Sequence, residues 1–120
     1  MKDYKLVLYL LLAMGIMAGC NNDSSSDLIA NPVLNNITYL SNVKSIIDNN
    51  CTSCHAATPI NGAPMPLINF DEVKDAVLNR GLIDRISRQQ GESGLMPTGA
   101  RLPQTTIDII IQWQQEGLQN

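Results

Sequence analysis

The stretch Cys51-Thr52-Ser53-Cys54-His55 decides how this chain of 120 residues is organised. Two thiols stand three residues apart, and a histidine follows at once, which is the C-x-x-C-H attachment signal for a c-type haem. This spacing lets the two thiols reach the two vinyl groups on one edge of a porphyrin and carries the histidine under the iron. The motif predicts one covalently bound haem c, attached at Cys51 and Cys54, with His55 as an axial ligand.

Three other uses of these cysteines compete with haem. A structural zinc site needs four Cys or His ligands, and the only candidates are Cys20, Cys51, Cys54 and the sole histidine, with Cys20 far away along the chain. A thioredoxin-like redox pair would follow a strand, and no strand is predicted before Cys51. A disulfide between Cys51 and Cys54 in an oxidising compartment stays open.

The composition also favours a bound apolar group. Only Tyr39, Phe70 and Trp113 supply aromatic rings outside the N-terminal apolar run. A domain of this size buries only about 60% of the surface of its unfolded chain and benefits from a staple, a metal or a cofactor. The formal net charge is -3 and Lys and Arg form no cluster, which argues against nucleic acid as a partner.

Residues 1–19 have the organisation of a lipoprotein signal peptide. Lys2 and Lys5 precede a short apolar run, and small residues come directly before Cys20. The run is shorter than the ~20 residues of a membrane span and indicates a secretory signal. Its end resembles the lipobox of bacterial lipoproteins, with Met17 where Leu is usual, so Cys20 is predicted to carry acyl chains. The alternative is an ordinary signal peptide or an uncleaved anchor, in which Cys20 has no role.

Residues 20–36 are expected to form the lipidated cysteine and a flexible tether. The stretch is rich in Asn, Ser and Asp and has little to bury. Acyl chains contribute about 0.8 kcal/mol per buried methylene and would hold the protein on a membrane without a span. The domain is therefore predicted to be exported and anchored on the periplasmic side or at the cell surface.

Residues 37–120 are predicted to form one small all-α domain of three to four helices. Leu40, Val43, Ile46 and Ile47 fall at helical spacing over residues 39–49, and Thr38 or Ser41 is available as a cap. This predicts a short helix that leads into Cys51.

Three further helical segments are predicted after the motif. Asn69 and Glu72 make a capping pair before a helix that ends near Gly81, and one or two more turns follow around Ile86. The last helix runs from about Gln104 to Glu116, with Pro103 at its start and Gly117 at its end. Loops rich in Pro and Gly separate these helices, and both loops contain Met-Pro.

The candidates for the second axial ligand of the iron can be reduced by elimination. His55 is the only histidine, and three of the five methionines belong to the signal, which leaves Met65 and Met96. Met65 stands only ten residues after His55 and is expected to pack or to line the cleft. Met96 is far enough along the chain to reach the other face of the haem, so it is the predicted ligand.

Four further segments strengthen this interpretation: Pro64-Met65-Pro66-Leu67, Leu82-Ile83-Asp84-Arg85-Ile86, Met96-Pro97-Thr98-Gly99 with Leu102, and Ile107 to Trp113 with Gly117. Together with the C-x-x-C-H motif they resemble the small bacterial monohaem c-type cytochromes of the type I fold. The resemblance extends from about Ile37 to Leu118.

The resemblance implies how the haem would be surrounded. The first and last helices would cross near one haem edge, with Trp113 packed close to the crossing as a structural residue. The carbonyl of Pro64 or Pro66 would accept a hydrogen bond from the ring of His55. Leu67 and Ile86 would belong either to the haem wall or to the general core, and Arg85 and Arg101 are candidates to pair with a propionate.

Saturated His/Met ligation leaves no open position at the iron, so an electron-transfer protein without a small-molecule substrate is expected, rather than an enzyme. It would carry single electrons or pass them into a larger assembly. The mature chain, with six basic and ten acidic residues, would suit redox partners with a basic docking surface. The alternative functions are a haem enzyme or gas sensor with an open or displaceable sixth position, and a haemless lipoprotein module with a disulfide.

Overall fold

The computed structural model describes residues 36–120. The predictions for the signal peptide, for Cys20 and for nearly all of the tether lie outside the described residues. Residues 36–120 belong to one compact unit. Its described part is helical and has no strand beyond one isolated parallel bridge between Thr38 and Gln119, which confirms the all-α prediction. No helix in this part is long and apolar enough to cross a membrane.

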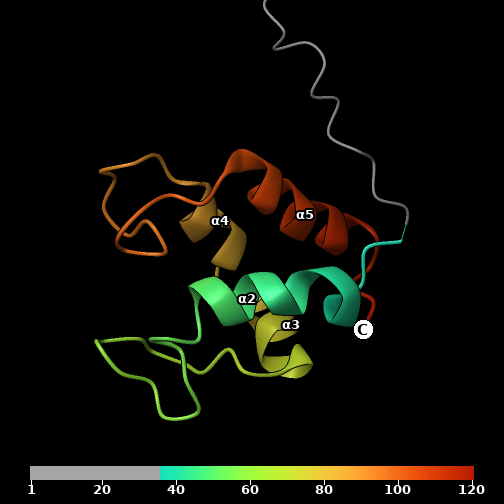
Figure 1. Ribbon diagram of the computed structural model, residues 1–120, viewed down its shortest axis with the longest axis horizontal. Helices are drawn as coiled ribbons and strands as arrows, with labels where there is room; N and C mark the ends of the chain where they lie inside the picture. Colours follow the sequence, from blue (N-terminus) through green and yellow to red (C-terminus); the bar gives the residue numbers. More distant parts are fainter. Residues whose placement is uncertain (1–35) are drawn as a thin grey trace, which may run out of the picture. The chain divides into compact units, whose positions relative to one another are not determined.

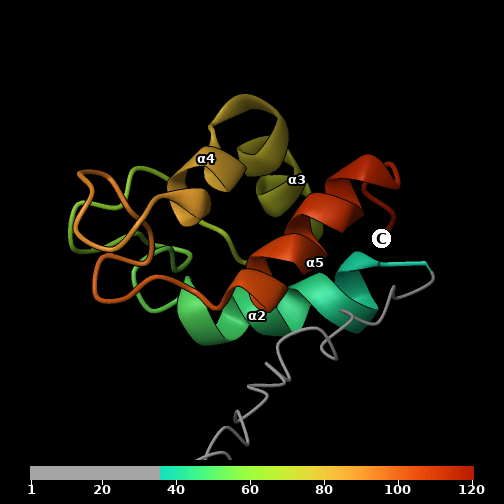
Figure 2. The same ribbon diagram turned by 90° about the horizontal axis from the view of Figure 1, so that it is seen from above.

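The helices follow each other in the order that the sequence predicts. They are η3 (Tyr39–Val43), α2 (Lys44–Asn50), α3 (Phe70–Asn79), α4 (Leu82–Ser87) and α5 (Gln104–Gln115). The α5 helix packs against η3 and α4, and α3 contacts α4. Two long loops connect α2 to α3 and α4 to α5. Both loops project from the same side of the helices, at the left of both views (Figures 1 and 2).

The first helix starts with a π-helical turn, which the sequence pattern does not predict. The carbonyl of Thr38 accepts hydrogen bonds from the amides of Asn42 at 3.1 Å and Val43 at 3.3 Å. Thr38 is also the N-cap, since its hydroxyl accepts a bond from the Ser41 amide at 3.1 Å. This resolves the choice between Thr38 and Ser41.

The π turn changes which side chains face the core. Tyr39, Val43 and Ile47 are all buried, at intervals of four residues. Four residues exceed one α-helical turn of about 3.6 residues and fall short of a wider π turn, so one turn of each kind keeps all three on one side. Leu40 is 65% exposed, so the prediction that it belongs to the apolar face is wrong.

The remaining helix ends agree with their sequence signals. Asn69 caps α3 by accepting a bond from the Glu72 amide at 3.0 Å, and the Glu72 carboxylate accepts one from the Ile68 amide at 2.8 Å. Gly81 separates α3 from α4 in a left-handed conformation with φ +67°. Pro103 precedes α5 without a side-chain cap.

Trp113 lies at the centre of the core, where the first and last helices meet. Its side chain is fully buried, and its ring centroid lies 6.0 Å from that of Tyr39 and 6.2 Å from that of Phe70. Its indole Nε1 donates to the carbonyl of Gln119 at 2.7 Å, and that carbonyl also accepts the Tyr39 amide at 2.8 Å. The expected packing of Trp113 at this crossing is confirmed. Through the shared Gln119 carbonyl, the start of the first helix and the C-terminal segment are held next to each other.

Tyr39 provides a first test of this core. Its side chain is buried, and its hydroxyl finds no hydrogen-bond partner among the described residues. Burial of an unpaired hydroxyl costs about 1–3 kcal/mol, so Tyr39→Phe is expected to raise the free energy of unfolding by about 1 kcal/mol in urea titrations. Tyr39→Leu should instead lower it, because the ring contacts with Phe70 and Trp113 are lost. A less stable Tyr39→Phe protein would contradict this assignment.

Candidate functional site

A cavity of about 700 Å³ opens between the two long connections and α4. Its volume falls within the range of about 300–1,000 Å³ that is typical of small-molecule and cofactor pockets. Most of its wall comes from three segments of the chain, which are the motif with the following loop, the end of α3 with α4, and the second loop. The lining residues include Cys51, Cys54, His55, Pro64, Met65, Leu67, Arg80, Leu82, Arg85, Ile86, Met96, Pro97, Thr98 and Gly99.

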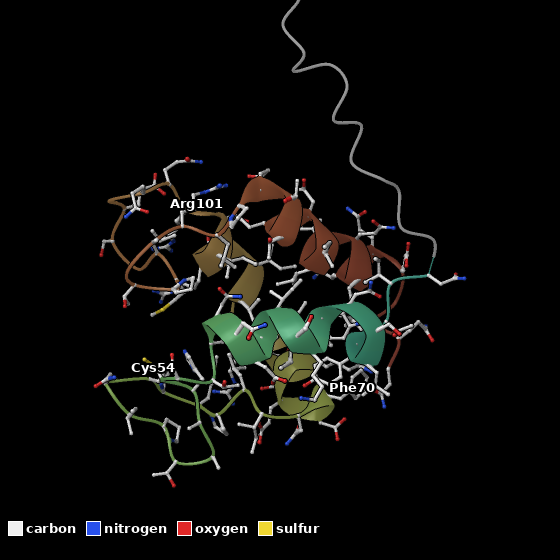
Figure 3. All side chains as sticks on the ribbon, in the orientation of Figure 1. Cys54, Phe70 and Arg101 are labelled. Carbon is white, nitrogen blue, oxygen red and sulfur yellow. The ribbon has the colours of Figure 1, made fainter. Side chains whose placement is uncertain are left out.

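The end of α2 presents the motif to this cavity. The Cys51 amide still donates to the carbonyl of Ile47 at 2.8 Å, and the Cys51 carbonyl accepts the amides of Cys54 at 3.1 Å and His55 at 2.9 Å. This tight turn holds both thiols and the imidazole against one cavity. Figure 3 shows Cys54 in the loop at the left, away from Phe70 at the start of α3.

Neither motif thiol forms a disulfide in this structure, and the Cys54 sulfur accepts a hydrogen bond from the Asn61 amide at 3.5 Å. Burial raises the pKa of the Cys51 thiol to about 11, since a thiolate loses hydration in this half-buried position. At neutral pH Cys51 is therefore a thiol rather than a thiolate. Among the described residues, no three His, Cys, Asp or Glu side chains gather closely enough to hold a metal ion.

The ring of His55 is fixed by the loop that follows it. Its Nδ1 lies 2.7 Å from the carbonyl oxygen of Met65, and the His55 carbonyl accepts the Leu67 amide at 2.9 Å. A carbonyl oxygen can only accept, so Nδ1 must carry the proton, and in the neutral ring Nε2 keeps its lone pair. The imidazole is thereby prepared to ligate a metal through Nε2.

The expected proline acceptor is wrong. The carbonyl that orients His55 belongs to Met65, which stands between Pro64 and Pro66. The bond from the Leu67 amide to His55 fixes the register of the loop, and this register turns the Met65 carbonyl toward the ring. Pro64 lines the cavity, whereas Pro66 is not among its lining residues.

Both candidate methionines line the cavity and are half-buried. The main chain of Met65 is held next to His55, because its carbonyl accepts the hydrogen bond from the His55 ring. Met96 is tied to α4, because its amide donates to the carbonyl of Arg85 at 3.1 Å. Of the predicted wall residues, Leu67 and Ile86 are buried and line the cavity.

Two arginines reach the cavity, and sequence reasoning identified only one of them. Arg85 lines it, and so does Arg80 at the end of α3. Arg80 was missed because nothing in the sequence shows that the end of α3 meets the cavity. Arg101 does not line the cavity, and its guanidinium donates to the carbonyls of Arg88 at 3.0 Å and Leu102 at 3.3 Å.

The cavity offers little acid or base chemistry. Its titratable lining residues are the two cysteines, His55 and the two arginines, and no Asp, Glu, Lys or Tyr belongs to the described lining. The acid and base groups of the described lining are therefore limited to the two thiols and the imidazole of the motif, apart from the two guanidinium groups. In comparisons with known proteins, no family model, no curated protein and no solved structure matches this chain.

Proposed function

We propose that the chain is an exported electron-transfer protein that binds one haem c covalently through Cys51 and Cys54. The observation that carries this proposal is the cavity of about 700 Å³ that brings the C-x-x-C-H motif, two methionines and an apolar wall together. In this proposal the domain is a small cytochrome c-like fold. When bound, such a haem supplies an iron that changes between the ferrous and ferric states.

The residues present fit this group. The two motif thiols and the His55 imidazole line the cavity, and the Met65 carbonyl orients that imidazole. Leu67, Leu82 and Ile86 supply apolar surface for a porphyrin plane. Of the two arginines in the lining, Arg80 would suit a negative propionate, with its Nε held by the Asp75 carboxylate at 2.7 Å. The guanidinium of Arg85 is instead engaged by the Gly94 carbonyl at 3.3 Å.

Met96 is the proposed second axial ligand. The Met65 carbonyl lies against the His55 ring, which keeps the Met65 backbone on the side of the first ligand. Met96 instead belongs to the loop after α4 and reaches the cavity from a different part of the chain. A thioether ligand raises the reduction potential and fills the last position of the iron, which favours electron carriage over catalysis.

The surroundings of the domain are proposed from the sequence. The acidic mature chain would dock redox partners that have a basic surface. Such charge complementarity raises the rate of association more than the binding affinity. Acyl chains on Cys20 would tether it to a membrane, on the periplasmic side or at the cell surface.

The haem content of the purified full-length protein, expressed with its signal peptide in a host that attaches haem c, tests the proposal. We expect one haem per chain, retained after denaturation and acid-acetone extraction because it is held by thioether bonds. The double variant Cys51→Ser, Cys54→Ser should lose the retained haem. Colourless wild-type protein with thiols free or joined to each other would refute the proposal. A haem protein whose ferrous form readily binds carbon monoxide would favour the gas sensor or enzyme instead.

A further inference from the structure

The loop that carries Met96 has no regular secondary structure of its own. It joins α4 to α5 over residues 88–103 and contains three glycines and two prolines. A thioether is a neutral and weak ligand, so it stays on iron only if the loop around it is held in place. The polar contacts of this Met96 loop therefore bear directly on the proposed ligation.

Arg85 holds the Met96 loop from α4 in two ways. Its carbonyl accepts the amide of Met96 at 3.1 Å, and its guanidinium Nη1 donates to the carbonyl of Gly94 at 3.3 Å. The side-chain bond and the main-chain bond thus fix the loop two residues before Met96 and at Met96 itself. Arg85 is an exposed residue, so its side chain can be changed without opening the core.

Arg88 adds a second guanidinium to the same stretch. Its Nη1 donates to the carbonyl of Ser93, and its Nη2 donates to the carboxylate of Asp84 at 2.7 Å. The Asp84 carboxylate compensates one positive charge where the two guanidinium groups converge on adjacent carbonyls. The Arg88 carbonyl also accepts Nε of Arg101 at 3.0 Å, which joins the two ends of the loop.

Gly94 is the position that lets both arginines approach. It has φ +79°, and a Cβ placed there would collide with Nη1 of Arg85 and with Nη1 of Arg88, the latter at 2.6 Å. Gly91 in the same loop has φ +91°, and a Cβ there would meet no atom within 4 Å. The two glycines therefore differ in their neighbours while sharing a left-handed backbone.

We infer that Arg85 and Arg88 are positioning residues that keep Met96 on the iron. Their guanidinium groups hold the carbonyls of Ser93 and Gly94, and we call these two contacts the clamp. The inference rests on the proposed function and adds to it the part of the chain that controls the sixth ligand. Partners that orient a metal ligand typically change metal affinity about 10- to 100-fold when they are removed. Loosening the clamp should therefore make Met96 easier to displace while leaving the haem attached.

Imidazole titration of the ferric haem protein measures how firmly Met96 is held. Gly94→Ala is expected to lower the apparent Kd of imidazole about 10- to 100-fold and to weaken the near-infrared sulfur band. Gly91→Ala is the matched control, because it has the same backbone strain in the same loop without touching an arginine, and it should stay near wild type. Arg85→Gln should lower the Kd as Gly94→Ala does, and Arg85→Lys should restore part of the loss.

The outcomes separate the two proposals. Wild-type protein without covalent haem overturns the proposed function and this inference with it. Wild-type protein with haem, together with equal imidazole affinities for Gly94→Ala and Gly91→Ala, overturns the clamp alone. If Gly94→Ala does not fold, Arg85→Gln decides, and an imidazole affinity equal to that of wild type would overturn the clamp.

Discussion

Replacing Met96 by alanine is expected to abolish the weak near-infrared band of ferric iron bound to sulfur. The substitution removes the proposed thioether ligand, and no other histidine is present in the chain to take its place. The ferrous protein should then bind carbon monoxide, because a position at the iron becomes open, and the reduction potential should fall. Absorption spectra of both oxidation states measure the first two effects, and a redox titration measures the third.

Met65→Ala is the matched control for this prediction. Met65 has the same side chain, is also half-buried and lines the same cavity, but its carbonyl is engaged by His55. The substitution leaves that carbonyl in place, so the sulfur band should remain. Loss of the band in Met65→Ala and its retention in Met96→Ala would mean that the ligand assignment is reversed.

The helices were predictable because their signals are local. Asn69 and Glu72 lie three residues apart and cap α3 as their spacing indicates, and Gly81 and Gly117 stand at helix ends with positive φ. Apolar spacing likewise located α5 and the short α4. Such patterns need no knowledge of the rest of the fold.

The errors arose where packing between distant segments decides the outcome. Leu40 looked apolar-facing at α-helical spacing, but the π turn between Thr38 and Val43 brings Tyr39 to the core beside Trp113 and Phe70. A single turn with a different period has no sequence signature that spacing alone can detect.

The sequence predicted which residues line the candidate site, but not the main-chain contacts that hold them in place. C-x-x-C-H and the two Met-Pro sequences identified the residues that meet at the cavity. The Met65 carbonyl and the arginine contacts to Gly94 depend on loop register, which side-chain identity does not encode. Main-chain acceptors are the same in every residue, so a pattern of residue types cannot single one out.

Replacing Trp113 by alanine should cause the largest loss of stability in this domain. The side chain is fully buried against Tyr39 and Phe70, and its Nε1 hydrogen bond at 2.7 Å holds the C-terminal segment at Gln119. Truncation of a buried Trp costs about 3–5 kcal/mol, a large part of the roughly 5–15 kcal/mol that a whole domain has. Thermal unfolding of the haem protein should show Tm lowered by on the order of 20 °C.

Two further variants test whether Trp113 acts through core packing rather than through ligation of the iron. Trp113→Phe keeps a six-membered ring in the core but loses the pyrrole part of the indole and its bond to Gln119, so it should cost about 1–3 kcal/mol. Leu78→Ala, at a side chain that is 54% exposed, should change stability by less than about 0.5 kcal/mol. Trp113 does not line the cavity, so the near-infrared sulfur band should persist in every variant that folds. A Trp113→Ala protein that melts like wild type would show that the two chain ends are held together by something other than this indole.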